Sequence, residues 1–165
     1  MQVLMNGERD EAVAVLGETG KDIREVVNVR PSDAQVPEDS WRWRLEMAEA
    51  IAAQVEPERF GVEALYVFGS AKNATAGPCS DIDLLIHCRS TQQQQEELIL
   101  WLQGWSQCLD EMNYLRTGHR TGGLLDVHIV TDEDIEKRTS FAVKIGAITD
   151  AARLLPIGGR GTQWR

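Results

Sequence analysis

The sequence predicts an α/β or α+β fold in which helices cover a small mixed β-sheet. Three observations lead to this class. Apolar strands are expected at 62–68 and 81–88, joined by a short polar loop, and a third is expected at 122–130. Amphipathic helices are expected before and between these strands. Acidic residues at strand starts suggest a functional sheet edge.

The first helix is predicted over 39–55, where an apolar stripe recurs at helical spacing. The stripe consists of Trp41, Leu45, Ala48, Ala52 and Val55. Asp39 or Ser40 can cap its start, and Pro57 follows its end. These signals agree on one helix that ends before the first strand.

A long second helix is predicted from Thr91 to about residue 115. Thr91 and Gln94 have the spacing of a capping box, which fixes a helix start. Its wide apolar face comprises Leu98, Trp101, Leu102, Trp105, Leu109 and Met112. After the third strand, Thr131 or Asp132 can start a short helix, and a last helix is expected over 141–155.

The chain of 165 residues has the usual size of one domain. We expect an N-terminal arm or linker over 1–37, the main domain over 38–157, and a flexible tail over 158–165. The arm is expected because glycines and prolines break its pattern, and the tail because chain ends fray.

Composition limits the function. A formal net charge of −9 opposes a broad nucleic-acid surface, which normally needs clustered lysine and arginine. No apolar run approaches the roughly 18 residues that a membrane span requires. The first residues lack a basic segment followed by an apolar one. Three cysteines, an odd number without metal-type spacing, are typical of reduced thiols, so we expect a cytoplasmic protein.

One spacing carries most of the functional information. The first strand runs into Gly69-Ser70, and after a ten-residue loop Asp81-Ile82-Asp83 opens the second strand. Side chains alternate along a strand, so Asp81 and Asp83 project from the same side. Paired carboxylates repel each other unless a cation lies between them, and Mg²⁺ is commonly held by carboxylates and substrate phosphates. A Gly-Ser turn lets backbone approach a phosphate.

A third acid strengthens this interpretation. Asp126 lies in the strand GGLLDVHIV and points to the same side as His128 and Val130. If this strand lies beside the Asp81 strand, Asp126 can reach the same cluster. Three carboxylates could hold two metal ions for an in-line displacement at phosphorus.

These residues resemble the minimal nucleotidyltransferases of the DNA polymerase beta superfamily. The family pattern is Gly-Ser, a spacer, Asp-x-Asp and a later Asp, here Gly69, Ser70, Asp81, Asp83 and Asp126. The resemblance implies the nucleotidyltransferase fold and transfer of a nucleoside monophosphate, AMP from ATP, to a protein or small-molecule acceptor. It implies Mg²⁺ at the three acids, which are also the catalytic residues, and phosphates at Gly69 and Ser70.

There is one departure from the family pattern. Small members often carry an arginine-rich stretch after Gly-Ser. Here the single cation of that stretch is Lys72, which is expected to contact the nucleotide. Some small members pair with helical toxin domains of the HEPN type. The chain also resembles segments attached to enzymes of the pyruvate, phosphate dikinase group, so fusion to a larger enzyme is another expected context.

Two alternatives remain open. The domain could be a non-catalytic nucleotide-binding, antitoxin or regulatory module of the same fold. It could also be a plain interaction domain that uses the apolar face of the long helix. Lys144 could reach a triphosphate, and His87, His128, His119 or Arg120 could touch substrate or acceptor. The alternative is that these residues have no role at the site: the histidines of the strands pack in the sheet, His119 and Arg120 lie in a solvated loop, and Lys144 is an exposed helix lysine.

Overall fold

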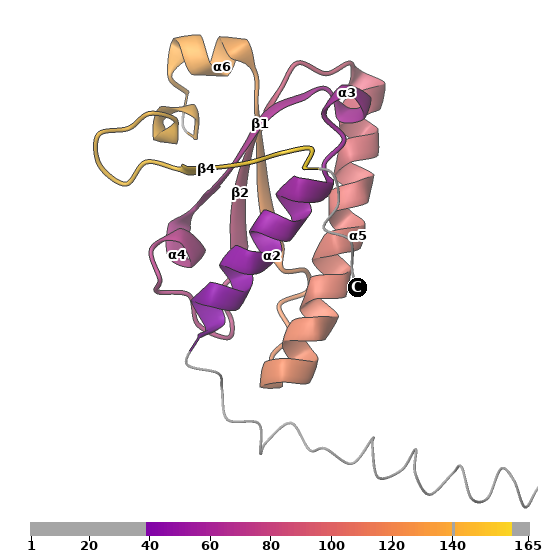
Figure 1. The fold of residues 1–165 in the computed structure, drawn as a ribbon, viewed down its shortest axis with the longest axis vertical. Coiled ribbons are helices and arrows are strands. Elements are labelled where there is room, and N and C mark those ends of the chain that lie inside the picture. Colours follow the sequence, from indigo (N-terminus) through magenta and orange to yellow (C-terminus); the bar gives the residue numbers. More distant parts are fainter. Residues whose placement is uncertain (1–38, 140, 160–165) are drawn as a thin grey trace, which may run out of the picture. The chain divides into compact units, whose positions relative to one another are not determined.

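The computed structural model describes residues 39–139 and 141–159, which belong to a unit that spans Val36–Arg165. The predicted arm over 1–37 lies outside the described residues, as do residues 160–165 of the predicted tail. Within the described part, four strands form one sheet and helices flank it (Figure 1).

The sheet is mixed, as predicted. Its strands are β1 (Val62–Phe68), β2 (Ile82–Cys88), β3 (Leu125–Val130) and β4 (Arg153–Leu155), in the order β3-β2-β1-β4. β1 runs antiparallel to β2 and β4, whereas β2 and β3 are parallel. Together with the helices, this mixed sheet confirms the predicted class.

The helices are α2 (Ser40–Gln54), α3 (Pro57–Phe60), α4 (Gly69–Lys72), α5 (Gln92–Thr117) and α6 (Asp132–Lys137), with a 3-10 turn η2 (Ala142–Lys144). α5 begins with the predicted capping box: Thr91 accepts from the backbone of Gln94, and the Gln94 side chain accepts from the backbone N–H of Thr91. α5 also serves as the crossover that parallel strands such as β2 and β3 require.

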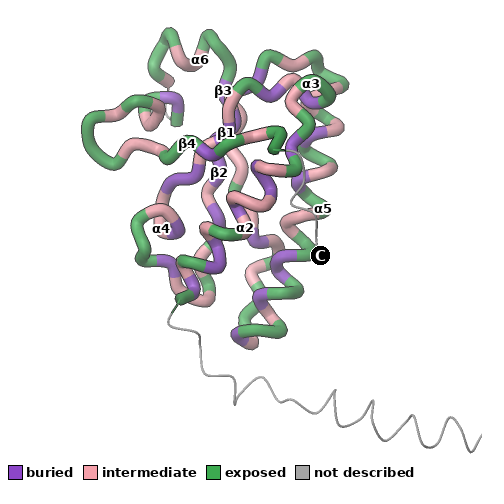
Figure 2. Tube along the Cα trace, viewed as in Figure 1, coloured by how far each residue is buried: buried purple, intermediate pink, exposed green. Residues whose placement is uncertain are grey.

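The two faces of the sheet are covered unequally. The main core packs α2 and α5 against the face that carries Leu84 and Ile86 of β2. The opposite face, which carries Leu85, has a smaller cluster with Phe68, Val130 and Ala142. Figure 2 shows buried residues along β2 and exposed residues on the outer side of α5. Because side chains alternate, Asp83 points to the lightly covered face, with Leu85.

The predicted last helix over 141–155 is wrong. Only the three residues of η2 are helical there, and the chain then forms a loop and the strand β4. Gly146 and Asp150 have φ values of +70° and +52°, which a right-handed helix cannot contain. β4 instead pairs with the free edge of β1, and Leu155 is buried opposite Leu65.

The first helix is correct in extent, and Ala48, Ala52 and Val55 of the predicted stripe are buried, but the buried face also includes residues outside that stripe. Trp43, Arg44 and Ile51 are buried, while Trp41 is only partly covered. Arg44 is fully inaccessible to solvent, a rare state for a charged side chain. Its hydrogen-bond partners outside α2 lie in the loop before β2 and in α5.

Within the described residues, every helix is too short or too polar to cross a membrane. All three cysteines fall in this part and carry free thiols. Cys88 is buried in the main core, and this burial raises the pKa of its thiol to about 11. A thiol with such a pKa is a packing residue rather than a nucleophile.

Candidate active site

The turn after β1 brings backbone directly against the second strand. Gly69 starts α4 immediately after Phe68, which is the register partner of Asp83. Gly69 has a φ of +64°, and a Cβ at this position would collide with the Asp83 carboxylate. Both the backbone conformation and this close approach therefore require glycine.

The sheet register brings the acids together. In the parallel pair β2–β3, Asp83 is the direct partner of Asp126. Asp81 lies two residues before Asp83, just ahead of β2. Asp83 is partly buried, whereas Asp81 and Asp126 are exposed. We call Asp81, Asp83 and Asp126 the carboxylate cluster.

Charge repulsion is already present in the cluster. Burial raises the pKa of Asp83, and the negative charges of Asp126 and Asp81 raise it further. Although Asp81 is exposed overall, partial desolvation of its carboxyl group raises its pKa, with Asp126 adding to the effect and Arg44 opposing it. The nearby like charges destabilise the ionised forms of Asp81 and Asp83, and a bound cation would relieve this repulsion.

The carboxylate cluster by itself is not a complete metal-coordination site. Among residues 39–139 and 141–159, no group of three or more histidine, cysteine, aspartate or glutamate side chains is arranged to hold a metal ion. Its donor chemistry nevertheless fits Mg²⁺, which prefers carboxylate oxygens and often keeps waters and substrate phosphates as its other ligands. If substrate phosphates supply some of the metal ligands, the acids alone are expected to form only part of the coordination shell.

Comparison with known proteins gives one match. A family model described as "Polymerase beta, Nucleotidyltransferase" matches residues 50–134, just over half of the chain. The chain belongs to this family. No curated protein and no solved structure matches it. The residues that match the nucleotidyltransferase family model include the Gly-Ser turn, Lys72 and the carboxylate cluster. They exclude Arg44, Lys144 and Asp150.

His128 lies on the same face of the sheet as Asp126. Its Nε2 lies 3.2 Å from Asp126 Oδ2, and its ring stacks on Phe141 with centroids 3.6 Å apart. His87 instead lies 2.7 Å from Asp132 Oδ1, outside the carboxylate cluster. Of the two strand histidines, His128 is therefore the one beside the acids.

The cations beside the Gly-Ser turn are engaged by one carboxylate. Lys72 donates to Asp150 Oδ1 at 2.8 Å, and Lys144 donates to Asp150 Oδ2 at 3.4 Å. Hydrogen bonds from Lys72, Asn73 and Lys144 hold the pKa of Asp150 far below its usual range. The predicted nucleotide contact Lys72 is thus in an ion pair rather than free.

Arg44 is a site residue that sequence reasoning missed. It donates from Nε to the carbonyl of Ser80 at 2.8 Å and from Nη2 to that of Pro78 at 3.0 Å. Nη2 also donates to Asn113 Oδ1 at 3.0 Å. These bonds hold the loop that leads into Asp81. The available signal was spacing, because Arg44 precedes Ala48 and Ala52 at steps of four within the apolar stripe.

Polar side chains of α5 bind the loop that precedes Asp81 and the loop that follows α5. Asn113 is fully buried and donates to the carbonyls of Pro78 and His119. Although burial opposes it, hydrogen bonds from Thr121 and Gly122 lower the pKa of Asp110. The loop after α5 is thereby attached to the helix, and Arg120 faces Glu111 instead of the acids.

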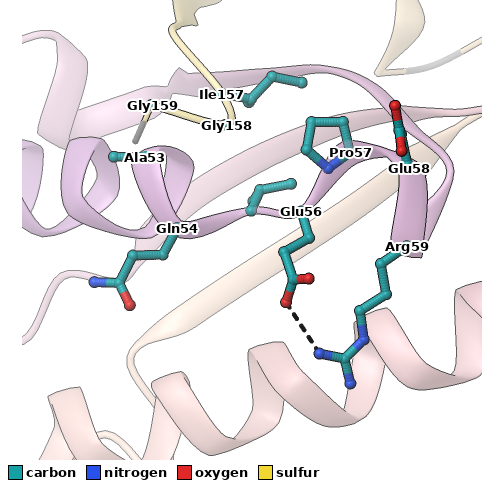
Figure 3. Close-up of a pocket in the computed structure, with 10 residues that line it drawn as sticks. Ala53, Gln54, Glu56, Pro57, Glu58, Arg59, Ile157, Gly158 and Gly159 are labelled. Carbon is teal, nitrogen blue, oxygen red and sulfur yellow. Dashed lines mark hydrogen bonds and ion pairs between the residues drawn. The ribbon is translucent and has the colours of Figure 1, made fainter. Parts of the chain in front are cut away.

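A separate hollow of about 760 Å³ lies away from the predicted site residues (Figure 3). It is lined by residues 53–59 and 157–159 and contains the ion pair between Arg59 and Glu56. None of the carboxylate cluster lines it. Its size therefore does not identify it as the active site.

Proposed function

We propose that this protein is a Mg²⁺-dependent nucleotidyltransferase that moves a nucleoside monophosphate, AMP from ATP, to a protein or small-molecule acceptor and releases pyrophosphate. The observation that carries the proposal is the register of β2 and β3, in which Asp83 faces Asp126 while Gly69 lies against Asp83. Membership of the family supports the class of reaction.

The roles follow from position. Gly69, Ser70 and Lys72 would hold the phosphates, because they form the turn and helix beside Asp83. The carboxylate cluster would hold the metal. Bound Mg²⁺ would supply charge neutralisation of the triphosphate and of the leaving pyrophosphate.

The chemistry is a displacement at the α-phosphorus. A hydroxyl or amine of the acceptor forms the new bond to phosphorus as the bond to the bridging oxygen breaks, and that electron pair leaves with pyrophosphate. The acceptor's proton passes to Asp126, the acid contributed by the other strand. His128, 3.2 Å from Asp126, orients that carboxylate.

A non-catalytic nucleotide-binding, antitoxin or regulatory module is the second candidate. It is favoured by the engagement of Lys72 with Asp150 and by the absence of arginine among residues 69–80. A helical toxin-type protein or a larger enzyme in the same chain would be its partner. In either case we propose a cytoplasmic protein, with nucleotide rather than long nucleic acid as its ligand.

The test measures binding and transfer separately. Wild-type protein should bind ATP in Mg²⁺ and lose that binding in EDTA, as calorimetry would report. Transfer is followed with α-labelled ATP against helical protein partners and small hydroxyl or amine acceptors. Binding that is equally strong in EDTA would remove the metal role of Asp81 and Asp83.

Asp126→Asn separates enzyme from binding module. A group used mainly in the transition state lowers turnover without changing ground-state binding. We expect the variant to bind Mg²⁺–ATP within roughly tenfold of wild type, about 1.4 kcal/mol, and to lose label transfer. Full transfer by the variant would exclude Asp126 from the active site. A wild type that binds Mg²⁺–ATP yet labels no acceptor would favour the binding module.

A further inference from the structure

Three side chains converge on a single carboxylate beside the Gly-Ser turn. Asp150 accepts hydrogen bonds from Lys72 at 2.8 Å, from Asn73 at 3.1 Å and from Lys144 at 3.4 Å. Two ammonium groups and an amide N–H form a donor set that suits a phosphate as well as a carboxylate. The arrangement is therefore an anion site that the chain fills with its own acid.

This anion site adjoins the carboxylate cluster. Lys72 and Asn73 end the turn that begins at Gly69. Lys144 Nζ lies 5.2 Å from the centroid of the Phe68 ring, and its positive charge partly offsets the raised pKa of Asp83. A phosphate chain that starts at the cluster would run toward these donors.

Two of the donors have contacts besides Asp150, since Lys144 Nζ lies over the Phe68 ring and Lys72 has a second acceptor. The backbone N–H of Ala152 donates to the carbonyl of Lys144 at 2.9 Å, which closes the loop that carries Asp150. Lys72 also donates to the carbonyl of Ala151 at 3.1 Å. These bonds would remain if the half-exposed Asp150 side chain moved away.

We propose that Lys72, Asn73 and Lys144 form the subsite for the terminal phosphates of the nucleotide, and that Asp150 occupies it until the nucleotide displaces its carboxylate. The inference rests on the proposed function for the identity of the ligand. It adds Asn73 and Lys144 as binding residues and makes Asp150 an internal competitor. Asp150 remains ionised at neutral pH, so the displacement depends on ligand concentration rather than on pH.

Asp150→Asn tests the competition. Asparagine tolerates the φ of +52° at this position, so the backbone can keep its conformation. Loss of the competing charge should tighten binding of Mg²⁺–ATP and of inorganic tripolyphosphate about threefold to tenfold at low salt. The gain should shrink as ionic strength rises.

Asp132→Asn is the matched control. Asp132 is also a half-exposed carboxylate with two nitrogen-bearing partners, Arg89 and His87. The substitution removes the same charge from the chain at a position outside the proposed subsite. Its affinity for both ligands should stay within about twofold of wild type, because long-range charge effects at an exposed position are screened.

Lys144→Gln allows a double-mutant cycle with Asp150→Asn. Alone it should weaken binding of both ligands, and in Asp150→Asn/Lys144→Gln the gain from Asp150→Asn should largely vanish, because the competitor and ligand share this donor. Thermal melting of each variant establishes that it is folded. The expected pattern is a gain in Asp150→Asn that depends on Lys144 and is absent from Asp132→Asn.

The two ligands distinguish failure of this inference from failure of the proposed function. Equal or weaker binding in folded Asp150→Asn would overturn the competition, even if wild type binds ATP. If tripolyphosphate follows the expected pattern while ATP binds no more tightly than tripolyphosphate, the subsite stands and the nucleotide assignment fails. Absence of binding by either ligand to every variant would overturn both.

Discussion

The surroundings of the Asp83 carboxylate oppose its ionisation. Its carboxylate is partly buried, faces Asp126 across the strand pair, and excludes any side chain at Gly69. Burial and like charges raise its pKa, so its ionisation at neutral pH opposes folding. Stability should therefore fall as pH rises from the ordinary aspartate pKa to the raised value in the fold.

Asp83→Asn is expected to leave the unfolding free energy unchanged or to raise it, on the order of 0.5 kcal/mol, in the absence of metal. The same variant should lose most of the stabilisation that Mg²⁺ and ATP give the wild type. Thermal melting at pH 7 with and without both ligands checks the two effects. A large loss of stability without ligands would instead identify Asp83 as a structural hydrogen-bond acceptor.

The site residues differ in how far sequence could identify them. Gly69, Ser70 and the two acids of Asp81-Ile82-Asp83 form a local pattern, and strand alternation predicts a shared face. Asp126 could be added because its strand has a clear period of two. Asp150 could not, because its partner Lys72 lies 78 positions away and a long-range ion pair has no local signal.

At the scale of elements, the helices and strands that the sequence predicted correctly are those specified by their own residues. The capping box at Thr91 fixes the start of α5, and the apolar run at 62–68 corresponds to β1. β4 was missed because a three-residue strand is specified by the free edge of β1 rather than by its own sequence. Tertiary pairing there overrides the helical spacing of nearby apolar residues.

Arg44 connects three elements, and its removal should be costly. Arg44→Met removes the donor to the buried Asn113 Oδ1 and to the partly buried carbonyl of Ser80, so we expect a loss of about 2–4 kcal/mol in urea unfolding. Arg42→Met is the control, since Arg42 is exposed and 3.7 Å from Asp39, and should cost under about 0.5 kcal/mol. Equal losses in the two variants would contradict a structural role for Arg44.

At the scale of the whole molecule, charge limits the ligand class. The formal net charge of −9 opposes the counterion release that drives binding to long nucleic acid. We expect generic RNA or DNA to bind more weakly than about 1 µM at physiological salt, as a filter-binding or anisotropy titration would measure. Sub-micromolar binding of generic RNA or DNA would contradict this prediction and would favour a polymerase-like substrate.

The parallel pairing of β2 with β3 also has a consequence for the order of folding. β1 and β2 can form a hairpin early, whereas β3 reaches β2 only after the long segment containing α5 has closed. We therefore expect Asp83 and Asp126 to meet later in folding than the residues of the β1–β2 hairpin. In stopped-flow refolding, competence to bind Mg²⁺–ATP should return with the final phase, and no early intermediate should hold the nucleotide.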